Sequence, residues 1–142
     1  MNLICVITDD LNYRRINFFM NMEEPFQDYG DFENPNNDKI VCVNITKTYW
    51  SSERSNIYEC ARKYWRLNGL RAGNADLVFA VCRGYVIGVF KPYRWFITDS
   101  DDYKYKGRWE FEGVEINDSP FLNMRIQEML QGRQNPVMYI NM

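Results

Sequence analysis

The stretch that decides the fold reads Ala75-Asp-Leu-Val-Phe-Ala-Val-Cys82, Arg83-Gly84, Tyr85-Val-Ile-Gly-Val-Phe-Lys91. Two almost wholly apolar segments, residues 76–82 and 85–91, are separated by only two residues, a spacing typical of a β-hairpin. Because both arms are apolar along their length, we expect them to lie centrally in a sheet that is covered on both faces. Gly88 inside the second arm predicts a bulge or a bend.

Further strands are predicted outward from this hairpin by short apolar or alternating segments. They are residues 3–8, 39–47, 93–97, 108–112 and 137–140. Residues 98–103 read as an acidic turn, and residues 13–22 alternate poorly, so they are compatible with either a strand or a short helix.

Two helices are predicted by apolar residues at helical spacing. The first covers residues 53–67, with Ser52 as N-cap and Asn68-Gly69 closing it, Gly69 in the left-handed conformation. Its core-facing stripe is Ile57, Ala61, Tyr64 and Trp65. The second opens at Ser119-Pro120 and ends at Gly132. Its apolar face is Leu122, Ile126, Met129 and Leu130.

The chain of 142 residues suits one domain, residues 1–142. The pattern predicts an α+β fold: a curled, mostly antiparallel sheet or small barrel of six or seven strands, with two packed helices. Residues 23–38 are rich in Glu, Asp, Asn and Pro, and we expect them to form an exposed, mobile acidic loop.

The charge is unevenly distributed. Residues 1–38 hold two basic and eight acidic residues, whereas residues 39–142 hold 15 basic and 11 acidic residues. The net charge of −2 disfavours general binding to duplex nucleic acid but is compatible with a local arginine pocket for one small anion. The N-terminal sequence lacks the basic region of a signal peptide, and no apolar run approaches the roughly 18 residues that span a bilayer. We therefore expect a cytoplasmic protein without membrane contact.

The chain has no histidine, which excludes a Ser-His-Asp or Cys-His centre within it. The four cysteines lie in apolar runs without C-x-x-C spacing and are expected to be buried thiols. Asp99, Asp101 and Asp102 lack the Gly and Glu of a calcium loop and read as a charged turn. Lys106 with Glu110 and Glu112 is only a faint match to a metal nuclease. We expect no catalytic residue, no metal and no cofactor.

Arginine beside tryptophan is the main functional pattern. Arginine binds phosphate through a bidentate fork, and tryptophan offers a surface on which a base stacks. An amide before a rigid proline can read the edge of a base. The candidate ligand-binding residues are Trp50, Trp65, Arg66, Arg94, Trp95, Arg108, Gln134 and Asn135.

Particular roles follow from these residue types. Arg94 and Arg108 are predicted to hold phosphate, Trp50 or Trp95 to stack a base, and Asn135 to read its edge. The alternative interpretation places the tryptophans in the core and the arginines at a solvated rim. For Gln134-Asn135 the alternative is a structural turn that caps the second helix.

A resemblance to known proteins extends over residues 48–141. Its most specific parts are Gly107-Arg-Trp-Glu-Phe-Glu-Gly113 and Gln134-Asn-Pro-Val-Met-Tyr139, which are preceded by Trp65-Arg66 and by residues 75–89. They resemble a small domain found alone in phages and bacteria or attached to restriction-type and GIY-YIG-type nucleases. Its layout is similar to PUA/EVE-like barrels, which bind modified bases or RNA in an aromatic cage. The chain also resembles phage anti-defence proteins, some of which sequester cyclic nucleotides as oligomers.

The resemblance implies binding without catalysis. Our first hypothesis is a non-enzymatic, phage-encoded anti-defence protein, acting in the host cytoplasm, that sequesters a nucleotide signal such as a cyclic nucleotide, with a homo-oligomer as one expected assembly. The alternatives are a reader of a flipped or modified base in DNA or RNA, and an acidic inhibitor in which residues 9–38 occupy a host nucleic-acid enzyme or defence protein.

Overall fold

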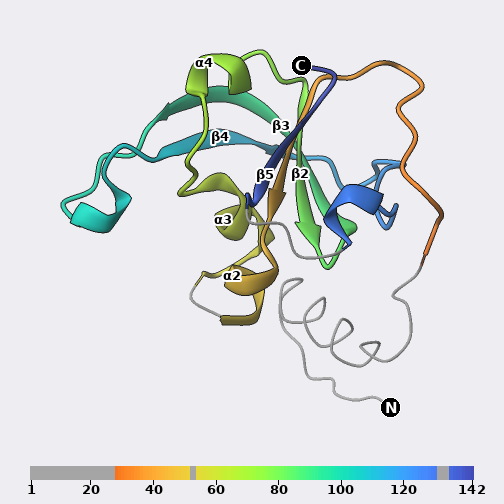
Figure 1. Cartoon of the computed structure of the whole chain (residues 1–142), viewed down its shortest axis with the longest axis horizontal. Helices are drawn as coiled ribbons and strands as arrows, with labels where there is room; N and C mark the ends of the chain where they lie inside the picture. Colours follow the sequence, from red (N-terminus) through yellow and green to blue (C-terminus); the bar gives the residue numbers. More distant parts are fainter. Residues whose placement is uncertain (1–27, 52–53, 131–134) are drawn as a thin grey trace.

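The fold is α+β and is built on a curled mixed sheet (Figure 1). The computed structural model describes residues 28–51, 54–130 and 135–142. Within these residues five strands lie in the order β4-β3-β2-β1-β5, and the sheet is not closed into a barrel. The strands are β1 Ile40–Asn44, β2 Leu77–Cys82, β3 Tyr85–Ile97, β4 Trp109–Glu115 and β5 Val137–Ile140. The helices are α2 Thr46–Ser51, α3 Ile57–Arg62 and α4 Gly69–Ala72, with 3₁₀ helices η1 Tyr103–Tyr105 and η2 Gln127–Met129.

The predicted hairpin forms between β2 and β3. Arg83 and Gly84 both have positive φ, 52° and 88°, as a two-residue turn of this kind requires. A side chain at Gly84 would also collide with Leu130, whose Cα lies 2.8 Å from the position of a Cβ. The register passes from Ala80 opposite Gly88 to Val81 opposite Val86, which confirms the predicted bulge.

Three of the four strand pairings are antiparallel, so the prediction of a mostly antiparallel sheet is confirmed. The exception is β1 with β2, which run parallel from Ile40 opposite Leu77 to Asn44 opposite Val81. A parallel pair needs a long crossover connection. Residues 45–76 supply it and contain α2, α3 and α4.

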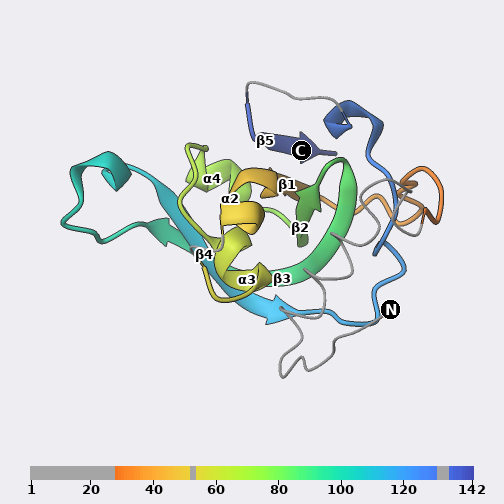
Figure 2. The same cartoon turned by 90° about the horizontal axis from the view of Figure 1, so that it is seen from below.

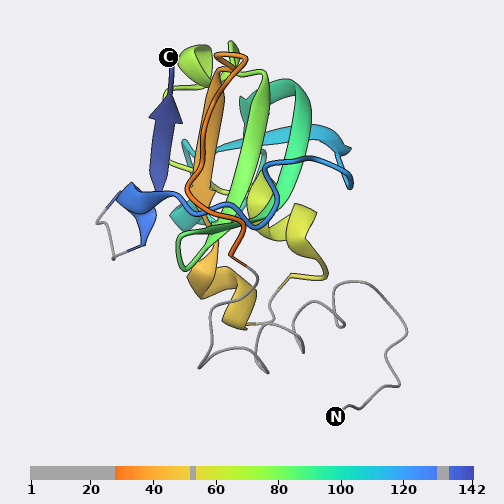
Figure 3. The same cartoon turned by 90° about the vertical axis from the view of Figure 1, so that its right-hand side faces the viewer.

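Both faces of the sheet are covered, as the apolar hairpin arms predicted. On the concave face lie α2, α3 and α4 (Figure 2), packed on side chains such as Val41, Val78 and Phe90. The opposite face carries Cys42 and Phe79, covered by residues 28–33 and 116–130, which run across the strands in Figure 3. Alternate residues of β1 and β2 thus serve two separate hydrophobic clusters.

The single long helix predicted over residues 53–67 is wrong. The helix here is α3, six residues long, and its N-cap is Asn56, whose side chain accepts a hydrogen bond from the backbone N–H three residues on (2.8 Å). Tyr64 and Trp65 follow the helix in extended backbone, because Trp65 pairs with β4 instead. Gly69 begins α4 and does not take the left-handed conformation at a helix end.

The helix predicted from Ser119 to Gly132 is also wrong. Turns and the short η2 occupy this segment. Its backbone is used in bonds to the hairpin: Asn123 N–H donates to Val86 O (2.8 Å), and Val86 N–H donates to Met124 O (3.0 Å). Tertiary pairing therefore overrides the helical periodicity.

Other predictions have mixed outcomes. The strand predicted over residues 39–47 ends at Asn44, and Lys47 lies in α2. Residues 93–97 continue β3, and residues 137–140 form β5 as predicted. In place of the two predicted helices the described residues hold three short α-helices, all between residues 46 and 72, and the 3₁₀ helix η2 in the second predicted segment. The segments predicted at residues 3–8, 13–22 and 23–27, together with Ser52 and Gln134, lie outside the described residues. None of the helices in the described part of the chain has the length and apolarity to cross a membrane.

Candidate functional site

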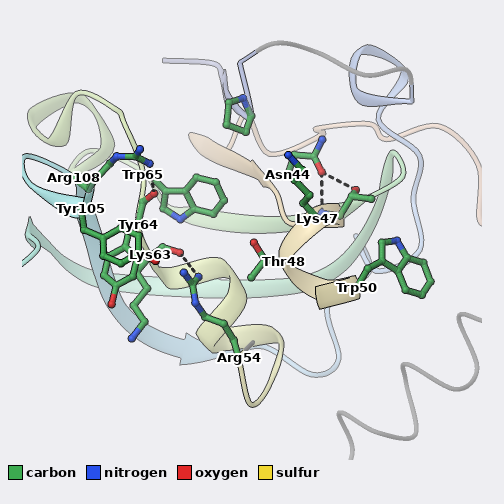
Figure 4. A pocket seen from close by; sticks show the side chains of 12 residues that line it. Asn44, Lys47, Thr48, Trp50, Arg54, Lys63, Tyr64, Trp65, Tyr105 and Arg108 are labelled. Carbon is green, nitrogen blue, oxygen red and sulfur yellow. Dashed lines mark hydrogen bonds between the residues drawn. The ribbon is translucent and has the colours of Figure 1, made fainter. Parts of the chain in front are cut away.

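A pocket of about 660 Å³ opens where β1 ends, beside α2, the end of α3 and the tip of the β3–β4 hairpin (Figure 4). Its lining comes from four separate parts of the chain. The lining residues are Asn44, Thr46, Lys47, Thr48, Trp50, Arg54, Lys63, Tyr64, Trp65, Tyr105, Arg108 and Pro136. Most of them belong to the crossover between β1 and β2, which leaves β1 at the end of the strand where the pocket opens.

The pocket wall is cationic. Among the twelve described residues that line it, four are basic, four are aromatic and none is acidic. Lys63 forms an ion pair with Glu59, whose carboxylate lies 3.5 Å from the Lys63 ammonium. A concave wall with one sign of charge favours an anionic ligand.

Arg108 is positioned by the extended segment that follows α3, residues 63–65, which we call the strap. Trp65 and Trp109 exchange backbone hydrogen bonds (2.9 and 2.8 Å), which fixes the strap against β4. Arg108 Nη1 then donates to the Tyr64 carbonyl (3.2 Å). The guanidinium has five N–H donors, so several remain for a ligand.

The same strap brings two tyrosine rings together. Tyr64 and Tyr105 stack with ring centroids 3.9 Å apart and planes inclined by 25°. Arg54 and Lys63 lie over the Tyr64 ring at 5.0 and 5.2 Å from its centroid. Arg54 Nη1 also donates to the Lys63 carbonyl (2.7 Å), so its guanidinium holds the strap in place.

Lys47 is the most available cation of the four. It is exposed in the first turns of α2, and its side chain makes no hydrogen bond or ion pair with any residue that the structure describes. Lys47 can therefore bind an anion without first losing another charged partner among the described residues.

A chain of hydrogen bonds forms the floor beside Lys47. The Arg83 backbone N–H donates to Thr46 Oγ1 (3.0 Å), and Thr46 Oγ1 donates to Asn44 Oδ1 (2.7 Å). The Thr46 backbone N–H donates to the same Asn44 oxygen (3.0 Å). Beneath them the Cys82 thiol interacts with the Thr46 side chain, and burial raises the pKa of this thiol to about 12. The thiol is therefore a neutral part of the floor at physiological pH.

Three of the residues predicted from sequence line this pocket: Trp50, Trp65 and Arg108. Trp65 is 7% exposed, and its Nε1 donates to the Ala61 carbonyl (2.6 Å), so it serves as wall. Figure 4 shows the Trp50 ring directed away from Trp65 and Arg108, at the rim. The Arg83 guanidinium lies 5.6 Å from the Trp50 ring centroid.

The other predicted residues lie elsewhere. Arg66 is exposed and does not line the pocket. Arg94 is exposed on β3 and forms an ion pair with Glu112 (2.7 Å). Trp95 packs on Phe111 with ring centroids 5.0 Å apart. These positions fit the alternative interpretation of solvated arginine and core tryptophan.

The Gln-Asn-Pro segment contributes its proline to the pocket. Asn135 Oδ1 accepts a hydrogen bond from the Val137 backbone N–H (3.0 Å), which makes a turn at the start of β5; the alternative interpretation, a turn that caps the second helix, is wrong because the segment before it forms turns and η2. Pro136 lines the pocket, and its carbonyl accepts from the Asn44 backbone N–H (2.8 Å). Gln134 lies outside the described residues.

Sequence reasoning missed most of the polar wall. Lys47 and Thr48 were included in a strand and a link, although polar residues directly after the buried strand β1 were a signal for an edge site. Tyr64 was assigned to the core face of a helix. Tyr105 had no signal in the sequence, because Tyr64, on whose ring it stacks, lies 41 residues earlier in the chain.

Metal binding finds no support in the described residues, which contain no group of three or more Cys, Asp or Glu able to hold an ion. Comparisons with models of protein families, with curated proteins and with solved structures give no match for this chain. The function is therefore argued from the pocket alone.

Proposed function

We propose that this chain is a non-enzymatic binding protein whose pocket takes a small nucleotide. The observation that carries the proposal is the composition of the described part of the wall, which has four basic residues, four aromatic residues and no acid. Phosphate needs cations and N–H donors, and a base needs flat apolar surface. The wall offers both within about 660 Å³, a size suited to a small ligand.

Lys47 and Arg108 are the proposed phosphate ligands. Lys47 makes no bond to other described residues, and Arg108 bonds only a carbonyl among them. Arg54 supports them indirectly, since it holds the strap that carries Tyr64. Trp50 at the rim is the proposed surface for the base.

Binding without conversion is favoured by the chemistry of the wall. General acid–base catalysis works best with a group that titrates near neutral pH, and the lining residues that the structure describes include no histidine and no carboxylate. Sequestration of a nucleotide signal is the biological role we propose for such binding.

The test is a titration calorimetry panel of mono-, di- and cyclic nucleotides with the wild-type chain and two single variants. Arg108→Ala is expected to weaken binding about 10- to 100-fold, because a hydrogen bond to a charged group contributes about 1.5–3 kcal/mol. Arg94→Ala is the matched control, as it removes an arginine beside tryptophan outside the pocket, and less than a twofold change is expected.

Two results would contradict the proposal. One is the absence of binding for every nucleotide in the panel, and the other is equal weakening by Arg94→Ala and Arg108→Ala. Salt dependence then separates a small ligand from a polymer. Affinity for oligonucleotides that falls steeply with salt, with weak binding of mononucleotides, would favour a reader of nucleic acid.

A further inference from the structure

Asn44 is the one amide side chain among the described residues of the pocket wall, and its hydrogen bonds determine the orientation of its amide group. Its Oδ1 accepts from the Thr46 backbone N–H (3.0 Å) and from Thr46 Oγ1 (2.7 Å). A flipped amide would set an NH₂ group against a backbone N–H and leave that donor unpaired. Figure 4 shows both bonds on the oxygen, with the amide nitrogen on the other side of the group.

The direction of the Thr46 hydroxyl proton follows from its other contact. Thr46 Oγ1 accepts from the Arg83 backbone N–H (3.0 Å), so its own proton is directed to Asn44 Oδ1. Both lone-pair directions of that oxygen are therefore occupied. Asn44 Nδ2 makes no hydrogen bond with any other described residue, so its two N–H donors are available to the pocket.

Asparagine usually pairs with adenine through both amide atoms, with the oxygen accepting from the amino group of the base. Asn44 lacks a free acceptor for that pairing. It can only donate. A base that presents an amino group here would set donor against donor, whereas an oxo group would accept from the Asn44 amide.

We infer that Asn44 makes the pocket selective for nucleotides whose base presents a carbonyl oxygen, such as inosine or uridine, over those that present an amino group at the same position, such as adenosine or cytidine. This inference rests on the proposed nucleotide binding. Asn44 is proposed to determine which bases bind, whereas Lys47 and Arg108 are proposed to bind the phosphate.

The test compares inosine monophosphate with adenosine monophosphate, and uridine monophosphate with cytidine monophosphate, by calorimetry on the wild-type chain. Each pair has the same phosphate and differs in the oxo or amino group. The oxo member is expected to bind about tenfold tighter, the value of one hydrogen bond gained against one donor left unpaired. Equal affinities, or preference for the amino member, would overturn the inference and leave the proposed nucleotide binding intact.

Two variants of Asn44 assign the selectivity to this side chain. Asn44→Asp keeps the acceptor for Thr46 and replaces the NH₂ group by an oxygen, so the preference should reverse toward the amino bases while all affinities fall through charge repulsion. Asn44→Ala should bring the ratio close to one, with thermal unfolding recorded to verify folding. An unchanged oxo-to-amino ratio in both variants would overturn the inference. Absence of binding by all four nucleotides to the wild-type chain would overturn the proposed function and the inference with it.

Discussion

The chain contains the pair Arg-Trp on two adjacent strands, at Arg94-Trp95 and Arg108-Trp109, and the two pairs have different surroundings. Arg94 is 57% exposed and bonds Glu112 across the hairpin, and Trp95 packs inward on a neighbouring ring. Arg108 faces a pocket and bonds a backbone carbonyl, and Trp109 pairs with Trp65 of the strap.

The difference lies in what covers each pair. Arg94 has an acid opposite it in the register, so its charge is already partnered. Arg108 precedes β4 at the edge of the sheet, where the strap after α3 adds a carbonyl and rings but no carboxylate. The same dipeptide therefore supplies a surface ion pair in one place and a cationic pocket residue in the other.

The largest expected effect comes from removing the ring on which Trp95 packs. Phe111 is 0% exposed and contacts the rings of Trp95, Phe90 and Tyr58. Phe111→Ala should lower the free energy of unfolding by about 3–5 kcal/mol, through lost burial and the cavity left behind. Urea denaturation measures it. The control is Phe96→Ala, at a half-buried site, where a smaller loss of unfolding free energy is expected. An equal loss in both variants would contradict the placement of Phe111 and Trp95 in the core.

The next effect concerns the other tryptophan. A Cβ on Gly69 would overlap the Trp109 ring, whose backbone is fixed by its bonds to Trp65. Gly69→Ala should therefore cost about 1–3 kcal/mol in the free energy of unfolding, even though alanine is the better helix former. Leu70→Ala, at a neighbouring surface position, is the control and should change little. A stabilised Gly69→Ala protein would mean that the Trp109 ring is free to move.

The smallest effect near neutral pH is a pH dependence on the pocket side, which develops only above about pH 8.5. The pKa of Cys82 is raised by burial to about 12, so the folded chain keeps this proton where the unfolded chain loses it. Its contribution is fully present below the pKa of an unfolded cysteine, about 8.5, and falls by about 1.4 kcal/mol per pH unit as pH rises toward 12. Urea denaturation at pH 8, 9 and 10 measures this slope. In Cys82→Ala the slope should be shallower, and identical slopes would contradict the assignment.

The strands and the hairpin were predictable because their signals are local. A two-residue gap between apolar arms fixed the β2–β3 turn, and Val137–Ile140 read as a strand from composition alone. The helices were not, because distant backbone competes for them. Trp65 has helical spacing from Ile57 and Ala61, yet its N–H and C=O bond Trp109, 44 residues later.

The candidate site was predictable only by residue type. Arginine beside tryptophan pointed to Trp50, Trp65 and Arg108, all of which line the pocket. The same rule selected Arg94 and Trp95, since sequence does not reveal that Glu112 lies opposite Arg94. Lys47 was missed because β1 ends where the Asn44 side chain accepts hydrogen bonds from the backbone N–H and the hydroxyl of Thr46, and the sequence does not show these contacts.

The crossover between β1 and β2 has a consequence for how this protein can change. Nine of the twelve described pocket residues lie between Asn44 and Trp65, in one piece of chain that starts at the end of β1 and ends where Trp65 pairs with Trp109 of β4. Insertions or exchanges within this piece alter the cavity while the strand register stays as it is. Substitutions confined to the pocket-lining residues of the crossover should therefore change which anions the pocket binds while the sheet stays the same.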